Sequence, residues 1–239
     1  MFRRIPFIGG GESYSDRVLS YSPIAYWQLN ETSGAAAVCS VNAAQNGTYT
    51  GVTLASSTGP DGQPVPLWDG ANDYCAIRTD ALAAAKNYDE GTMMIWGKMS
   101  GVGVWTDSTS RIMIQLQDAN IAANNLVMKR TTDNGTLQIS RLGDSTDKVR
   151  STSGLSTTGW FHLAMTWTIA GDALISYYNG AAGDAIAGNQ AASNQTVIGS
   201  RTYIGAISTS GQIWSGYLAH AAIWTSILTP TQILDLATV

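Results

Sequence analysis

The sequence predicts an all-β protein built as a sandwich or a barrel. Its 239 residues include 25 Gly, 10 Tyr and 8 Trp, a composition typical of strands joined by tight turns. From Tyr21 onward, short apolar stretches alternate with turn signals, and no strand–helix alternation indicates a parallel sheet. Hydrophobic residues make up 44% and charged residues 13% of the chain, so it can bury a large core.

The strands are predicted where apolar stretches end at Gly, Asn or Asp turns such as Asn46-Gly47, Gly59-Pro60-Asp61-Gly62 and Asp133-Asn134-Gly135. The expected strands, in chain order, are 24–29, 65–68, 74–78, 92–99, 111–116, 125–129, 135–141, 161–168, 173–178, 196–205 and 213–224. A short helix is expected within 79–87. A last helix runs to Leu236 from Thr229-Pro230, because Thr caps helices well and Pro suits the first helical position.

Two segments are expected along the chain. Residues 1–20 are predicted to form an N-terminal arm and linker, and residues 21–239 a single sandwich domain. The apolar stretch 5–8 is too short for the core of a signal peptide and contains Pro6, so no cleaved leader is expected. No apolar run reaches the ~20 residues of a membrane span. A net charge of −4 disfavours nucleic acid as a partner.

The two cysteines, Cys39 and Cys75, leave two alternatives open. They could form one disulfide, or they could be two free buried thiols, since free Cys is among the most buried residue types. Two cysteines alone make neither a disulfide framework nor a zinc site.

Several ordered motifs resemble those of laminin-G-like, concanavalin A-like jelly rolls. They are AYWQLNETSG at 25–34, LWDGANDY at 67–74, GWFHLAMTW at 159–167, YYNG at 177–180 and WSGY at 214–217. The resemblance covers residues 21–238 and implies a two-sheet antiparallel jelly-roll sandwich with short helices. It says little about function, because one fold carries many.

The resemblance also raises the question of catalysis, since glycosidases of this fold use paired carboxylates facing one way on a strand. The chain has only three Glu, at positions 12, 31 and 90, and none has an acidic partner two residues away on an inward strand. We therefore expect no enzyme and no catalytic residues. His162 stands where relatives have a structural histidine, and Ala219 and His220 stand where they have an acidic pair.

Two binding sites are candidates at the rim of the sandwich. Trp105 and Trp214 lie near glycines and could form an exposed platform on which a sugar stacks. Calcium is the other candidate, because some relatives hold Ca²⁺ at the rim and this ion prefers oxygen ligands. Its candidate ligands are Asp69, Asn72, Asp73 and Asp107, with hydrogen bonding within the turn as the alternative. No other cofactor is expected. Core packing is expected for the remaining aromatics: Trp27, Trp68, Trp96, Trp160, Trp167 and Tyr178.

The functional hypothesis is a non-enzymatic structural protein of a bacteriophage virion, because sandwiches of this class also decorate phage particles. It would be a surface-exposed capsid decoration or a head- or tail-fibre component, assembled in the host cytoplasm and able to self-associate. Its arm would dock on other virion proteins through apolar anchors and arginines. The docking residues are Phe2, Arg3, Arg4, Ile5, Phe7 and Ile8. The alternative is a lectin-like module that binds host or environmental glycans.

Overall fold

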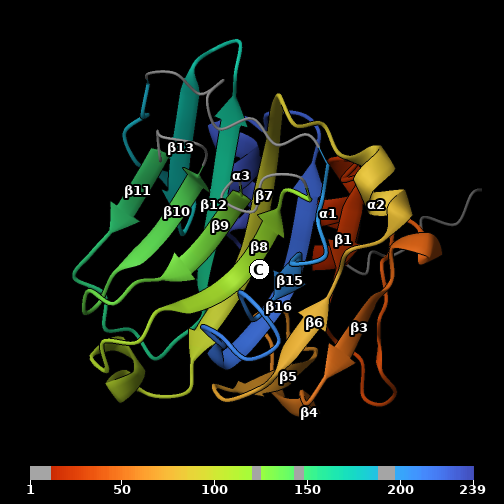
Figure 1. Ribbon diagram of the computed structural model, residues 1–239, viewed down its shortest axis with the longest axis vertical. Coiled ribbons are helices and arrows are strands. Elements are labelled where there is room, and N and C mark those ends of the chain that lie inside the picture. Colours follow the sequence, from red (N-terminus) through yellow and green to blue (C-terminus); the bar gives the residue numbers. More distant parts are fainter. Residues whose placement is uncertain (1–11, 120–124, 143–147, 188–196) are drawn as a thin grey trace, which may run out of the picture.

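Two antiparallel sheets form a sandwich in the computed structural model, which describes residues 12–119, 125–142, 148–187 and 197–239 (Figure 1). Sheet I contains, from edge to edge, β14 (Ala181–Ala182), β13 (Ala173–Tyr178), β12 (Phe161–Thr168), β7 (Glu90–Met99), β16 (Ser215–Trp224), β5 (Pro64–Asp69) and β4 (Thr53–Thr58), with β1 (Ala25–Trp27) also paired to β16. Sheet II contains β11 (Lys148–Thr152), β10 (Leu137–Leu142), β9 (Asn125–Arg130), β8 (Arg111–Gln117), β15 (Tyr203–Ile204), β6 (Tyr74–Ala76), β3 (Gly47–Thr50) and β2 (Ala36–Ala37). The predicted all-β jelly-roll sandwich is confirmed.

The helices are short. They are α1 (Tyr14–Ser20), α2 (Asp80–Ala85) and α3 (Pro230–Leu236), with 3₁₀ turns η1 (Ala43–Gln45) and η2 (Val102–Trp105). The last helix begins as the sequence predicts, since the Thr229 hydroxyl accepts a hydrogen bond from Gln232 N and Pro230 is the first helical residue. None of the helices in these residue ranges is long and apolar enough to cross a membrane.

The main core lies between the sheets. Strand β12 shows the alternation that builds it: Phe161, Leu163, Met165 and Trp167 face the space between the sheets, while the intervening residues face outward. Four of the expected core aromatics are buried, namely Trp27, Trp68, Trp96 and Trp167, whereas Trp160 and Tyr178 are only partly covered.

A second apolar layer covers the outer face of sheet I. Trp96 belongs to this layer rather than to the space between the sheets, and Tyr14 and Val18 of α1 pack into it together with Ile233 and Leu236 of α3. In Figure 1, α3 lies behind the β12–β7 part of sheet I. We call this side of the molecule the outer face.

Helix α1 corrects the expected domain boundary. Tyr14 and Val18 are one helical turn apart and both are buried, so they anchor the helix to the sandwich. The Tyr14 hydroxyl donates to Leu236 O at 2.6 Å, and Arg17 Nη1 donates to Asp235 O at 3.1 Å. Residues 14–20 therefore belong to the folded domain rather than to a linker.

The two cysteines are both buried and both free, which settles the alternatives left by the sequence. Burial raises the pKa of the Cys75 thiol well above its usual range, so it stays protonated and behaves as a small apolar side chain.

Candidate functional site

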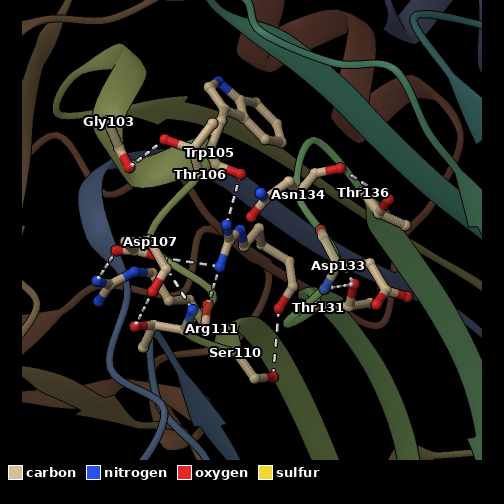
Figure 2. Close-up of polar contacts among 12 residues, drawn as sticks. Gly103, Trp105, Thr106, Asp107, Ser110, Arg111, Thr131, Asp133, Asn134 and Thr136 are labelled. Atoms are coloured by element: carbon tan, nitrogen blue, oxygen red, sulfur yellow. Dashed lines mark hydrogen bonds and ion pairs between the residues drawn. The ribbon is translucent and has the colours of Figure 1, made fainter.

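Trp105 lies in a tightly bonded cluster at the rim of the sandwich (Figure 2). Its side chain is 1% exposed, and its Nε1 donates to Thr157 O at 2.7 Å. Its carbonyl oxygen accepts from Gly135 N at 2.9 Å and from Arg130 Nη2 at 2.5 Å. Trp105 thus holds three loops together, those around residues 105, 135 and 157.

Asp107 completes this cluster, which we call the rim cluster. Its Oδ1 accepts from Arg130 Nη1 at 2.9 Å, and its Oδ2 accepts from Arg111 Nη2 at 2.6 Å. Arg130 is completely buried and also donates to Thr109 O. Burial would raise the pKa of Asp107, but the hydrogen bonds from Arg111 and from the backbone N–H of Thr109, with the charges of Arg111 and Arg130, outweigh burial and lower it. Both carboxylate oxygens are engaged within the protein.

The expected sugar platform at Trp105 and Trp214 is wrong. Trp214 is fully buried, and its ring lies 6.4 Å from that of Phe161, while the ring of Trp105 lies 5.8 Å from the same phenyl ring. The structure does bring the two tryptophans together, but inside the core. Neighbouring glycines indicated exposure, yet here the loops fold back over the indole rings and seal them from solvent.

The calcium candidates do not form a suitable set of ligands. Asp69 Oδ1 accepts from Ala71 N at 2.7 Å, and Asp73 Oδ2 accepts from Asp69 N at 2.8 Å, so both serve their own turn. Asn72 is exposed on that turn, and Asp107 is neutralised by two guanidinium groups. Within the described residues, no three His, Cys, Asp or Glu side chains gather in a way that could hold a metal.

The arm residues Phe2, Arg3, Arg4, Ile5, Phe7 and Ile8 lie outside the described residues. The docking role expected for them therefore stays a prediction.

A polar pocket on the outer face was not predicted by the sequence analysis. Its volume is about 340 Å³, and it lies between the start of α1, the segment after β1, and the turn that joins β4 to β5. Its lining is composed of hydroxyl, amide and carboxyl side chains: Ser13, Tyr14, Ser15, Gln28, Asn30, Asp61 and Gln63. This volume is near the lower end of the range for small-molecule sites, about 300–1,000 Å³. We call it the outer-face pocket.

A buried hydrogen-bonded chain leads inward from this pocket. Asp61 Oδ2 lies 3.2 Å from His220 Nε2, and His220 Nδ1 lies 2.7 Å from the Tyr26 hydroxyl. When Nε2 donates its proton to Asp61, Nδ1 is left to accept from Tyr26, so one tautomer satisfies both contacts. His220 is 1% exposed and Tyr26 is fully buried. The pocket carboxylate is therefore held from behind by a fixed imidazole.

The position of His220 depends on an irregularity in β16. The register of β16 against β7 shifts between Ala219 and Ala222, and His220 has a φ of 51°, in the left-handed region. A bulge redirects one side chain relative to the regular alternation. Here it turns His220 toward Asp61, which comes from a hairpin turn far away in the sequence.

A partly exposed aromatic pair lies beside the same hairpin. The rings of Trp160 and Tyr217 are 6.5 Å apart, and Lys98 Nζ lies 5.6 Å from the centre of the Tyr217 ring. Trp160 Nε1 donates to Thr58 O at 3.2 Å, only three residues before Asp61. The β4–β5 hairpin thus contributes to both the aromatic pair and the outer-face pocket.

Glu31 shows that a candidate acid of this chain has a structural role. Its Oε1 accepts from Val38 N at 2.7 Å, and its Oε2 accepts from the Tyr49 hydroxyl at 2.8 Å. Burial raises the pKa of Tyr49 strongly, so the phenol stays protonated as the donor. This pairing ties the segment after β1 to β3 and presents no second carboxylate.

The fold and these sites define a lectin-like sandwich, and the chain belongs to the concanavalin A-like lectin/glucanases superfamily. The family model matches residues 69–234, well over half of the chain. No curated protein matches the sequence.

Solved structures with the same fold include binding domains. The binding domain of botulinum neurotoxin serotype D matches with a TM-score of 0.67 and 13% identity, over 90% of this chain and 50% of that chain. The same toxin's ligand-binding domain in complex with N-acetylneuraminic acid matches with a TM-score of 0.62, 12% identity and the same coverage. This chain spans about half the length of those toxin chains. At such identities the likeness shows the fold alone.

Another similar structure is a domain of about the same length as this chain. It is domain 4 of AbnA, an extracellular GH43 arabinanase from Geobacillus stearothermophilus, in complex with arabinotriose. The TM-score is 0.65 with 15% identity, over 90% of this chain and 98% of that domain.

Proposed function

We propose that this protein is a non-enzymatic carbohydrate-binding domain whose ligand site is the outer-face pocket. The observation that carries the proposal is the lining of the pocket, where Gln28, Asn30, Asp61 and Gln63 converge from two segments that are distant in the sequence. Convergent amide and carboxyl groups suit a ligand with many hydroxyls, because each hydroxyl can both donate and accept.

The aromatic pair supports the same proposal. Trp160 and Tyr217 are both partly exposed and lie along the hairpin that carries Asp61. An aromatic ring offers a flat apolar surface with little conformational entropy to lose, which suits the C–H face of a sugar. The aromatic pair would contact an extended oligosaccharide, while the outer-face pocket holds one ring of it.

The relatives add support of a general kind. Solved structures of the same fold carry N-acetylneuraminic acid in one case and arabinotriose in another. In the sequence, none of the three Glu residues has an acidic residue two positions away, and Glu31 is engaged in structural bonds.

Binding to a broad glycan array, followed by calorimetry with the best ligand, tests this proposal. We expect Gln63→Ala and Trp160→Ala each to weaken binding about tenfold or more, the loss for one or two contacts. The matched control is Asn134→Ala, an exposed amide at the rim, which should leave binding unchanged. The proposal fails if no glycan binds, or if Asn134→Ala reduces binding while the two outer-face changes do not.

We propose in addition that this domain is carried on the surface of a bacteriophage virion, assembled in the host cytoplasm and attached through its N-terminal arm. The composition of the arm supports this, since apolar anchors accompany Arg3 and Arg4.

Electron microscopy of native particles with a labelled antibody against this chain tests the virion proposal. We expect label on the capsid or tail and loss of label when Phe2 and Phe7 are both changed to Asp. Finding the protein only free in solution or in the host envelope would contradict it. Its self-association is measured separately, by light scattering of the purified chain.

A further inference from the structure

Among its seven lining side chains, the outer-face pocket has one ionisable acid, Asp61, and no basic group. On α1, Asp16 is also negative, and its carboxylate accepts from the Ser13 hydroxyl at 2.7 Å. Arg17, the positive charge of α1, lies with its Cζ 5.8 Å from the centre of the Tyr14 ring, and its guanidinium donates to the carbonyls of Asp235 and Thr238 beside α3. The lining of the pocket itself thus carries one carboxylate and no cation.

The Asp61 carboxylate is held ionised and keeps capacity to accept hydrogen bonds. Burial would raise its pKa, but the hydrogen bonds from His220 and from the backbone N–H of Gln63 outweigh burial and lower it. Its Oδ1 accepts from Gln63 N at 3.1 Å, and its Oδ2 accepts from His220 Nε2. Each carboxylate oxygen can accept a second hydrogen bond, which a ligand hydroxyl can supply.

Two of the polar residues around Asp61, Tyr14 and His220, have their polar atoms engaged within the protein. The Tyr14 hydroxyl accepts from Trp96 Nε1 at 2.7 Å and donates to Leu236 O, so it has no proton for a ligand. His220 has both ring nitrogens engaged, and its backbone N donates to Gln28 O at 3.0 Å. Asp61 is thus the strongest acceptor that faces the pocket.

We propose that the outer-face pocket selects a neutral sugar ring and excludes carboxylate-bearing sugars, with Asp61 accepting from ligand hydroxyls and His220 positioning Asp61. This inference rests on the proposed carbohydrate function and specifies its ligand class. A hydroxyl can donate to the Asp61 carboxylate, whereas a sugar carboxylate can only accept, and it would lose water beside a like charge. Selectivity then arises from repulsion of the wrong ligand as well as attraction of the right one.

A titration of the full chain followed by nuclear magnetic resonance tests this inference. The probes are the methyl glycosides of glucose, galactose and mannose, against glucuronate and N-acetylneuraminate at equal concentrations. We expect at least one neutral glycoside to shift the side-chain amide signals of Gln28, Asn30 and Gln63. The acidic sugars should bind at least about tenfold more weakly.

Three variants extend the test, and the first two separate charge from shape. Asp61→Asn should raise binding of the acidic sugars to within about threefold of the neutral ones. Gln63→Lys, at an exposed position that should tolerate the change, should also admit the acidic sugars because it adds a cation to the lining. His220→Asn, which suits the left-handed backbone, should weaken neutral-sugar binding and reduce the discrimination together.

The outcomes distinguish the two proposals. Acidic sugars that shift the same amides as strongly as neutral ones would overturn the selectivity and leave the carbohydrate function standing. A full panel that shifts none of these amides would overturn both. Unchanged discrimination in both Asp61→Asn and Gln63→Lys would show that Asp61 does not set it.

Discussion

The rim cluster and the outer-face pocket each pair an aspartate with a buried basic side chain. In the rim cluster the aspartate is fully engaged within the protein, whereas in the outer-face pocket it can still accept hydrogen bonds. At the rim, the completely buried Arg130 holds Asp107, and at the outer face the buried His220 holds Asp61. Arg111 takes the second oxygen of Asp107, and Trp105 adds its carbonyl oxygen to the network. Each carboxylate oxygen of Asp61 accepts a single hydrogen bond, and Asp61 lines a pocket of about 340 Å³.

Under the proposed function, the unused bonding capacity of a carboxylate, rather than its presence, distinguishes a binding group from a structural one. Asp107 was expected only as a candidate calcium ligand. The two arginines donate to both carboxylate oxygens of Asp107, and these hydrogen bonds fix the loops. Asp61 was expected only to make a turn, yet its position over His220 leaves it able to receive a ligand. The following predictions test this difference between a structural rim cluster and a ligand-binding outer-face pocket.

The largest effect is expected for Arg130→Met. This change leaves the carbonyls of Trp105 and Thr109 without their buried donor and removes one partner of Asp107. A hydrogen bond to a charged group contributes about 1.5–3 kcal/mol, and this change removes three of them, so the free energy of unfolding should fall by about 3 kcal/mol or more. Urea denaturation measures it.

The matched control for Arg130→Met is Arg78→Ala. Arg78 pairs with Asp80 at 2.6 Å, but their side chains are 39% and 91% exposed. Such a pair contributes about 0–1 kcal/mol. If the two variants lose equal stability, the rim cluster does not lock the loops.

The second prediction concerns acid pH and the layer beneath the outer-face pocket. His162 is fully buried against Met94 and Trp96, and burial lowers its pKa to about 3. Below about pH 6.5 the unfolded chain binds a proton that the folded chain does not bind. The free energy of unfolding should therefore fall by up to about 1.4 kcal/mol per pH unit between pH 6 and pH 3.

Denaturation at several pH values, with His162→Met as the comparison, checks this slope. The variant removes the titrating group and keeps an apolar side chain of similar size, so its acid slope should be shallower. Equal slopes in the two proteins would mean that His162 does not resist protonation.

The third prediction tests the hydrogen bonds that run from Tyr26 through His220 to Asp61 behind the pocket. Tyr26→Phe removes the hydroxyl that lies 2.7 Å from His220 Nδ1 and leaves the rest of the ring in place. One lost buried hydrogen bond costs about 0.5–1.5 kcal/mol of unfolding free energy. Thermal melting measures the loss, and neutral-sugar binding should weaken modestly because His220 is held less firmly. A variant with unchanged stability and binding would contradict the role of this chain.

The sequence predicted those elements whose local pattern matches their environment. Strand β12 reads as an apolar strand and is buried on both faces, and α3 begins at Thr229-Pro230 with its cap in place. Strand β4 was missed because its residues are polar and mostly exposed. Helix α1 was missed too, although Ser13 followed by Asp16, with Tyr14 and Val18 one turn apart, is a helix-start signal that could have revealed it.

The site was harder to predict because it depends on contacts between distant segments. His220 was noted as a departure from the pattern of relatives, but nothing local pairs it with Asp61. Their contact requires a bulge in β16 and a hairpin that carries Asp61 to it. Likewise, exposure of Trp105 cannot be read from adjacent glycines, because the loops that bury it come from elsewhere in the chain.

The smallest effect on stability is expected for Gln63→Ala. This variant is also the sharpest test of the difference between the structural rim cluster and the ligand-binding outer-face pocket. Gln63 is exposed, so the free energy of unfolding should change by less than about 0.5 kcal/mol while glycan binding falls. Its counterpart is Trp105→Phe, which loses the bond to Thr157 O and should cost about 1–2 kcal/mol without changing glycan binding. Stability and binding would then be controlled by separate regions. If Trp105→Phe weakened binding as much as Gln63→Ala, ligand recognition would depend on the rim loops, and the outer-face pocket would lose its assigned role.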